Sequence, residues 1–104
     1  MMMIDANNYN QEVMQAETLV MLDFYADWCG PCKMIAPVVE SLAAELEGVV
    51  KVGKVNVDNN QELAAHFEIM SIPTLVFIKN GEMVAKLVGL RDKKEIMQEI
   101  ENWK

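Results

Sequence analysis

Residues 18–25 form an apolar run, TLVMLDFY, in which apolar and polar positions do not alternate. A strand with one face in water alternates between the two kinds of residue, whereas a strand covered on both faces reads as a continuous apolar run. The run therefore predicts a strand inside a sheet that is covered on both sides. One residue breaks the pattern, because Asp23 places an acid within this strand.

A long helix is expected directly after this strand. It would begin at Cys29 or Pro31 and run to Leu46, because the apolar residues of this segment recur at helical spacing. Pro31 suits the first turn of a helix, and Pro37 is expected to kink the helix because proline lacks a backbone donor. Gly48 marks the expected end.

Three shorter helices are expected elsewhere in the chain. The first would be capped by Asn7 or Asn8 and run to about residue 16, and the second would cover residues 61–67. The last opens with Asp92 and Glu95, which have the spacing of a capping box. The residues expected to face inward are Tyr9, Val13 and Met14 in the first helix and Ile96, Met97, Ile100 and Trp103 in the last.

Four further segments are expected to be strands, namely residues 1–4, 49–58, 74–79 and 82–89. The last two flank Asn80-Gly81, which is a strong hairpin signal because both turn residues tolerate a positive φ. The resulting order of strands and helices predicts an α/β sandwich, with a parallel portion of the sheet followed by an antiparallel hairpin.

The chain is acidic and has the length of one small domain, with 104 residues and a formal net charge of −7. Nucleic acids and anionic membrane surfaces select basic patches, so neither is expected as a partner. No apolar run reaches about 18 residues, so no transmembrane helix is expected. Residues 1–10 lack the basic and apolar regions of a signal peptide. A cytoplasmic location is therefore expected.

The two cysteines, Cys29 and Cys32, enclose Gly-Pro at the point where the buried strand leads into the long helix. Three kinds of site compete for such a pair. A zinc site normally needs four ligands, and the chain adds only His66 to the two thiols. A purely structural disulfide would close a very short loop and would constrain the unfolded chain little. A redox-active pair fits best, and no metal or bound cofactor is expected.

The position of the pair favours thiol chemistry. Cys29 would lie at a helix N-terminus, where free N–H groups and the helix dipole stabilise a thiolate, and the thiolate is the reactive nucleophile. Cys32 lies one turn further on and could attack a mixed disulfide formed by Cys29. Gly30 and Pro31 keep the turn between them tight.

The segment DFYADWCGPCKMIAP, residues 23–37, resembles the active-site segment of the thioredoxin family. Further matches are KVNVD at 54–58, SIPT at 71–74, KNGE at 79–82 and VG at 88–89, in the order and spacing of that family. The resemblance covers nearly the whole chain. It implies one domain over residues 1–104, with the three-layer α/β thioredoxin-like sandwich: a central mixed sheet of four to five strands flanked by four helices.

The resemblance also implies roles for single residues. Cys29 corresponds to the attacking thiol and Cys32 to the thiol that resolves the mixed disulfide. Trp28 would pack beside the pair and shape the substrate surface, although plain core packing is an alternative. Pro73 matches a cis-proline that faces the disulfide, and Gly89 matches a glycine beside the site, which could instead be a strand end or bulge.

Asp23 has two interpretations. A buried carboxyl would have a raised pKa and could accept the proton of Cys32, whereas an acid on an irregular strand could face solvent. The family resemblance favours the first. Lys54 matches the lysine that neighbours this acid in the family, and the alternative is a strand lysine whose ammonium reaches water.

The expected substrate surface is an apolar rim around Cys29, formed by Trp28, Gly30, Pro31, Ile72, Pro73 and Gly89. Met70 precedes Ser71-Ile72-Pro73 and would either line this rim or fill the core; core packing is the interpretation for Met21, Met34, Met83 and Met97 as well. Two positions depart from the commonest bacterial pattern of the family, because Tyr25 replaces a frequent tryptophan and Ser71 a frequent glycine.

The resemblance implies a monomeric protein-disulfide reductase that is recharged by a thioredoxin reductase using NADPH, with disulfide-containing proteins as clients. An oxidant or isomerase on the same fold is an alternative, although Gly-Pro between the cysteines resembles the reducing members. A glutaredoxin is disfavoured because the Trp-Cys-Gly-Pro-Cys run is absent there. The alternative from another class is a binding subunit that docks on a larger enzyme without redox turnover.

Overall fold

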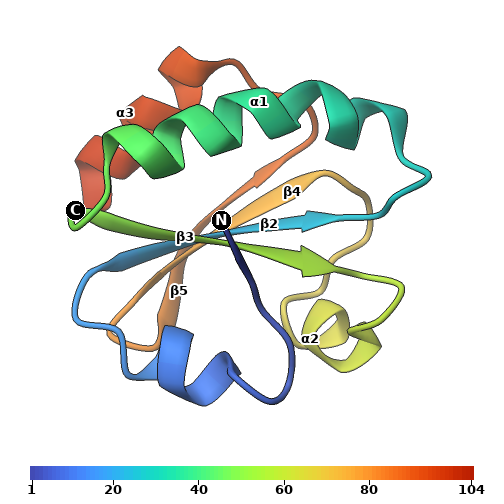
Figure 1. Cartoon of the computed structure of the whole chain (residues 1–104), viewed down its shortest axis with the longest axis horizontal. Helices are drawn as coiled ribbons and strands as arrows, with labels where there is room; N and C mark the ends of the chain where they lie inside the picture. Colours follow the sequence, from blue (N-terminus) through green and yellow to red (C-terminus); the bar gives the residue numbers. More distant parts are fainter.

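Strand β2, Leu19–Tyr25, is the central strand of a five-stranded sheet in the computed structural model, which describes residues 1–104 (Figure 1). The first six of its seven residues are buried. Layers of helices cover both faces of this strand, which explains why its apolar residues do not alternate with polar ones. The prediction from the sequence is confirmed.

The sheet has the order β1-β3-β2-β4-β5. Strands β1, Met2–Met3, and β3, Val50–Asn56, run parallel to β2 on one side. On the other side, β4, Thr74–Lys79, pairs antiparallel with β2, and β5, Glu82–Val88, pairs antiparallel with β4. The predicted mixed sheet, parallel first and antiparallel at the end, is confirmed.

The turn between β4 and β5 is the predicted two-residue hairpin. Asn80 has φ of 52° and Gly81 has φ of 81°. Two successive residues with positive φ match the right-handed twist of the flanking strands, and asparagine and glycine adopt this conformation most readily. The turn fixes the pairing of Lys79 with Glu82 at its base.

Four helical segments form the outer layers. Helices α1, Gly30–Glu45, and α3, Lys93–Trp103, cover one face of the sheet, whereas the π-helical segment η1, Asn10–Met14, and helix α2, Gln61–His66, lie against the other (Figure 1). Each face has its own apolar core, one of eleven buried residues under α1 and α3 and one of nine on the opposite side. This is the three-layer sandwich that the family resemblance implies.

Helix α1 follows directly on Cys29 and begins where the sequence predicts. Cys29 is its N-cap residue, and Pro31 lies in the first turn. The helix continues without interruption through Pro37 and ends at Glu45. Gly48 follows with φ of 85°, a left-handed conformation that stops a helix and that glycine adopts at little cost.

Helix α3 has the predicted capping box. The carboxylate of Asp92 accepts a hydrogen bond from the backbone N–H of Glu95 at 2.8 Å, and the carboxylate of Glu95 accepts one from the backbone N–H of Asp92 at 3.3 Å. Ile96 and Ile100 are buried. The prediction for Trp103 was wrong: this residue is 38% exposed, and its indole N–H donates to Glu99, since Trp103 lies beyond Ile100, the last buried residue of the helix.

The first helical segment differs from the prediction. Its start is held by Asp5, whose carboxylate accepts hydrogen bonds from the N–H groups of Asn7 at 2.8 Å and Asn8 at 3.3 Å, so neither asparagine is the cap. Val13 is buried, whereas Met14 is exposed. The segment contains only five residues with π-helical geometry, and it is too short to bury a full helical face.

Met34 and Met83 were wrongly predicted to pack in the core, and of the two alternatives for Met70 the core position is wrong. Met21 on β2 is fully buried, but Met34, Met70 and Met83 are exposed. Met34 lies on the outer side of α1 and Met83 on the edge strand β5, where no layer covers them. Apolar character alone therefore does not place a methionine inside.

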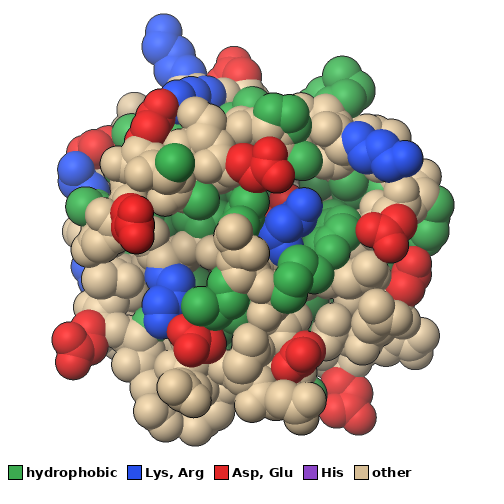
Figure 2. Space-filling view, in the orientation of Figure 1, with side chains coloured by type: hydrophobic (Ala, Val, Ile, Leu, Met, Phe, Trp, Pro, Cys, Tyr) green, Lys and Arg blue, Asp and Glu red, His purple; other side chains and the backbone are tan.

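Charged side chains of both signs are spread over the face shown in Figure 2, where acidic groups are interspersed with basic ones. Of the helices in the structure, none combines the length and the apolar character that crossing a bilayer requires.

A candidate redox site at the start of helix α1

Cys29 and Cys32 form a disulfide at the joint between β2 and α1. Their Cα atoms are 5.2 Å apart, since one turn of helix separates them. Together with Ala26 they form a small buried cluster, against which Tyr25 and Ile72 pack. The fold thus brings the pair to one end of the sheet, beside the segment that leads into β4.

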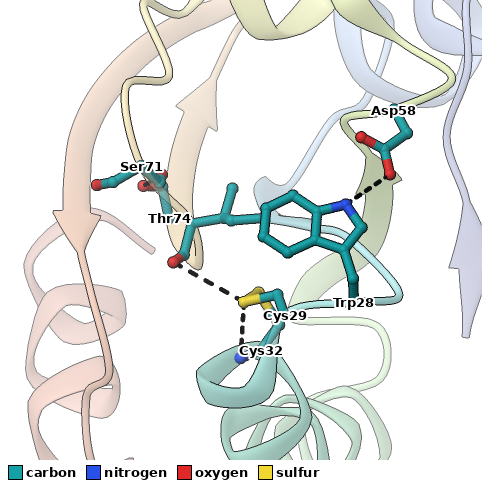
Figure 3. Close-up of a disulfide and its surroundings, with 7 residues drawn as sticks. Trp28, Cys29, Cys32, Asp58, Ser71 and Thr74 are labelled. Atoms are coloured by element: carbon teal, nitrogen blue, oxygen red, sulfur yellow. Dashed lines mark hydrogen bonds between the residues drawn. A yellow bond between two sulfur atoms is a disulfide. The ribbon is translucent and has the colours of Figure 1, made fainter.

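Cys29 is the N-cap residue of α1, and its side-chain sulfur makes the capping hydrogen bond. It accepts a hydrogen bond from the backbone N–H of Cys32 at 3.2 Å (Figure 3). Cys29 itself has an extended backbone conformation, with φ of −87° and ψ of 113°, as an N-cap residue requires. After reduction, the same N–H and the helix dipole would stabilise a thiolate at Cys29.

The loop before β4 lies directly beside the disulfide. The sulfur of Cys29 is 3.9 Å from the carbonyl oxygen of Ile72, and the Ile72–Pro73 peptide bond is cis, as the resemblance implies. The carbonyl oxygen of Pro73 accepts a hydrogen bond from the N–H of Gly89 at 2.8 Å. Gly89 has φ of 90°, which explains why glycine is suited to this position.

Trp28 lies on the surface, so the core-packing alternative is wrong. Its side chain is 71% exposed, and its indole Nε1–H donates a hydrogen bond to the carboxylate of Asp58 at 2.9 Å (Figure 3). Asp58 follows β3 and was not singled out from the sequence. The only signal was that it ends the motif KVNVD, which carries no information about a partner thirty residues away.

An apolar hollow of about 380 Å³ adjoins the disulfide. Met70 stands at its border with 93% of its side chain exposed. The lining residues are Trp28, Val57, Ala64, Ile69, Met70, Ser71 and Ile72. Three of the residues predicted for the substrate surface, Trp28, Met70 and Ile72, thus meet here.

The other residues predicted for the rim differ in exposure. Gly30 and Pro31 are exposed at the start of α1, and Gly89 is half-buried. Pro73 is buried, so it supports the rim from beneath and is not part of its exposed surface. The reason is that its peptide leads into β4, which is covered on both faces.

Asp23 is fully buried under α1, and neither of its carboxylate oxygens has a hydrogen-bond partner. On β4 its neighbour is the apolar Leu75. Burial raises the pKa of Asp23 to about 6, and the positive charge of Lys54 partly opposes this rise. The solvent-facing alternative for Asp23 is therefore wrong.

Lys54 lies opposite Asp23 in the register of β2 and β3. It is half-buried, and its ammonium nitrogen is 4.3 Å from the centre of the Tyr25 ring. A hollow of about 140 Å³ opens at this place behind Cys32. Its lining residues are Tyr25, Ala26, Asp27, Cys32, Lys33, Ala36 and Lys54.

A hollow of about 730 Å³ is remote from the disulfide. It lies at the opposite end of α1, between Glu40–Gly48 and the beginning of β3. No cluster of three or more His, Cys, Asp or Glu side chains is placed to hold a metal ion.

The chain is similar to known thioredoxins along nearly its whole length. The thioredoxin family model matches residues 1–102. The thioredoxin of Haemophilus influenzae is 48% identical over 93 residues, which cover 89% of this chain and 87% of that protein. The thioredoxin of Bacillus subtilis is 45% identical over 102 residues, which cover 98% of this chain and 97% of that protein.

A matching family model over almost the entire chain and relatives at this level of identity agree with the five-stranded sandwich and with the disulfide at the start of α1. Thioredoxins are disulfide oxidoreductases, and the cysteine pair that such chemistry needs is present here. The chain belongs to the thioredoxin family.

Proposed function

We propose that this protein reduces disulfides in client proteins, with Cys29 as the attacking thiol and Cys32 as the resolving thiol. The observation that carries the proposal is the position of the Cys29 sulfur at the N-terminus of α1, where it accepts the N–H of Cys32 at 3.2 Å. A thiolate is stabilised at such a position, and the thiolate is the form that attacks a disulfide.

The reaction has two exchange steps. In the first, the Cys29 thiolate attacks one sulfur of the client disulfide, so that a mixed disulfide forms and the second client sulfur leaves as a thiolate. In the second, the Cys32 thiolate attacks the sulfur of Cys29 and releases the first client sulfur. Two electrons pass to the client, which gains two thiols, and Cys29–Cys32 becomes the disulfide of the structure.

Asp23 is proposed to accept the proton of Cys32 before the second step. A carboxyl with a pKa of about 6 can hold or release a proton near neutral pH, which an ordinary exposed carboxylate does far less. Its burial without a hydrogen-bond partner supports this role. Lys54 is proposed to modulate Asp23 by its charge.

Clients are proposed to bind as extended segments across the surface around Cys29. Trp28, Met70 and Ile72 would supply apolar contacts from the hollow of about 380 Å³. The residues proposed for the remainder of this surface are Gly30, Pro31 and Gly89, and Pro73 is proposed to support it from beneath. The high exposure of Trp28 and Met70 supports the proposal, because such large apolar groups are free to contact a partner.

The disulfide is proposed to be reduced again by a thioredoxin reductase that takes its electrons from NADPH. We also propose that residues 1–104 act as one domain, as a monomer and in the cytoplasm. The family membership supports the reductase, and the Gly-Pro pair between the cysteines resembles the reducing members of the family.

A turnover assay tests the proposal. The protein is incubated with NADPH, a bacterial thioredoxin reductase and insulin as a disulfide-bonded client, and NADPH oxidation is followed. Cys29→Ser and Cys32→Ser should each abolish turnover, and Asp23→Asn should slow it between pH 6 and 9. Full turnover of the cysteine variants would refute the proposed roles, and absence of turnover in the unchanged protein would favour the binding-subunit alternative.

A further inference from the structure

The sheet face under α1 changes character at the carboxyl ends of β2 and β3. Successive residues of a strand point to opposite faces, so Met21, Asp23 and Tyr25 share one face of β2, and Val52 and Lys54 share the same face of β3. Met21 and Val52 belong to the apolar core. The next positions along both strands hold an acid, a phenol and an ammonium group in one small area.

The ammonium group of Lys54 has an aromatic ring as its partner. It lies 4.3 Å from the centre of the Tyr25 ring, well within the distance of about 6 Å at which a cation is attracted to a ring face. Lys54 forms none of the four ion pairs in the structure, and both oxygens of Asp23 are unpaired. The cation is thus near the buried acid without contacting it.

Tyr25 is itself held in place from two sides. Its hydroxyl lies 3.8 Å from the thioether sulfur of Met3, to which it donates, and its carbonyl oxygen accepts the N–H of Val57 at 2.9 Å. Burial, and then the negative charge of Asp27, raise the pKa of the Tyr25 hydroxyl, so the ring stays neutral at physiological pH. The ring is therefore a fixed, uncharged surface for the ammonium group.

We propose that Tyr25 is a positioning residue for Lys54: its ring holds the ammonium group at the hollow behind Cys32, near enough to act on Asp23 through its charge and too far to form an ion pair with it. The inference rests on the proposed role of Asp23 as proton acceptor. An acid paired directly with a lysine would be a poor base, whereas an acid with no nearby cation would keep its proton to higher pH.

Few other charges act on this place. The charged side chains that line the hollow besides Lys54 are Asp27, from the loop after β2, and Lys33, from α1. The position on β4 that faces Asp23 holds the apolar Leu75. Lys33 therefore offers a matched control, because its substitution removes the other cation of the same hollow without touching the Tyr25 ring.

The test measures the titration of the Asp23 carboxyl carbon by ¹³C NMR in the oxidised protein. Lys54→Met should raise the midpoint by up to about one pH unit, the smaller end of the effect of a neighbouring opposite charge. After Tyr25→Phe, which keeps the ring, Lys54→Met should have the same effect. After Tyr25→Leu, which removes the ring, it should have less than half of that effect, and Lys33→Met should have little effect in any background.

The proposal would be overturned if Lys54→Met moved the Asp23 midpoint equally with and without the ring. It would also be overturned if Lys54→Met, made alone, did not move the midpoint. A second measurement needs no variant at Tyr25. In the unchanged protein the ε-methylene protons of Lys54 should be shifted upfield of those of the other lysines by the ring current, and an ordinary shift would also overturn the proposal.

Failure of this inference is separable from failure of the proposed function. The titration uses the oxidised protein without client or reductase, so it reports on Asp23 whether or not the protein turns over. If insulin reduction proceeds while Lys54→Met acts equally in all backgrounds, only the role of Tyr25 is refuted. If the titration behaves as proposed while insulin is not reduced, only the function is refuted.

Discussion

Asp23 and Lys54 lie directly opposite each other in the register of two parallel strands, yet no hydrogen bond or ion pair joins their side chains. Neighbouring strands lie only about 4.8 Å apart, so two long side chains in this relation on a shared sheet face can reach each other. Here Asp23 remains buried and unpaired, and the ammonium group lies over the ring of Tyr25. The acid therefore destabilises the fold when ionised, and this cost has a measurable dependence on pH.

Asp23→Asn should raise the free energy of unfolding at neutral pH. The folded protein keeps the proton of Asp23 up to a pKa of about 6, whereas an unfolded chain releases it near a pKa of about 4. Below about pH 4 the protonated Asp23 therefore adds nothing to the cost of folding, whereas its ionisation lowers the free energy of unfolding as the pH rises through 6. This decrease is about 3 kcal/mol, and the variant should not show it because asparagine does not ionise.

Urea unfolding of the oxidised protein at several values between pH 4 and 8 measures this difference. The gap between variant and unchanged protein should widen from pH 4 to pH 7 and then stay constant. Asp27→Asn is the control, because it removes an exposed acid from the loop that directly follows β2. A gap that is constant from pH 4 to 8 would contradict a raised pKa for Asp23.

Cys32→Ser should trap mixed disulfides. The Cys29 thiolate can still attack a client, but no second thiol is present to release it, so a covalent adduct should accumulate. Non-reducing electrophoresis and mass spectrometry of the variant after mixing with insulin would detect the adduct at Cys29. Cys29→Ser is the matched control and should yield little adduct, and an equal yield from both variants would argue against the assigned order of attack.

Asp58→Ala should weaken client turnover through Trp28. The carboxylate of Asp58 is the hydrogen-bond acceptor that orients the exposed indole, and a typical intramolecular hydrogen bond contributes about 1 kcal/mol. Loss of this orientation should lower kcat/KM for insulin about fivefold, with a small effect on stability. The neighbouring Asn59→Ala is the control.

The fluorescence of Trp28 gives a second measurement for this contact. In a Trp103→Phe background Trp28 is the only tryptophan, so tryptophan emission, excited at a wavelength that tyrosine does not absorb, reports on one indole. Asp58→Ala should shift this spectrum while Asn59→Ala leaves it unchanged. An unaltered spectrum together with unaltered kcat/KM would show that the hydrogen bond has no part in client binding.

Gly89→Ala should destabilise the protein by about 1 kcal/mol. Space is not the reason, because nothing lies within 4 Å of an added Cβ; the backbone φ of 90° is the reason, since residues with a Cβ rarely adopt it. Gly30→Ala is the matched control, because it has equal space and lies in a helix. Denaturant midpoints that fall equally for both variants would contradict this explanation.

The sequence was sufficient for most of the architecture, since the relevant signals are local. The apolar run around Asp23 predicted a strand covered on both faces, whereas the burial of the acid was favoured only by the family resemblance. The Asn80-Gly81 pair predicted the hairpin, and Asp92 with Glu95 predicted the cap of the last helix. Each of these features depends on neighbouring residues, so a pattern along the chain records it.

The contacts between distant segments were not predictable in the same way. Trp28 with Asp58, and Lys54 with Tyr25, are about thirty residues apart in sequence and meet only because β2 and β3 pair in parallel. Hydrophobicity was also a poor guide where an apolar residue has a surface role. Met70 is exposed because it lies in a loop at the border of the hollow, which no periodic pattern indicates.

The most direct test of the proposed chemistry is the reduction potential of the Cys29–Cys32 pair, measured by equilibration with dithiothreitol buffers. A potential of about −270 mV is the general reference value for thioredoxins and lies well below that of the oxidising members of the fold. A potential below about −250 mV is the expected result and would make the protein a reductant of client disulfides. A potential above about −200 mV would contradict the proposal and would assign this protein to oxidation or isomerisation of its clients.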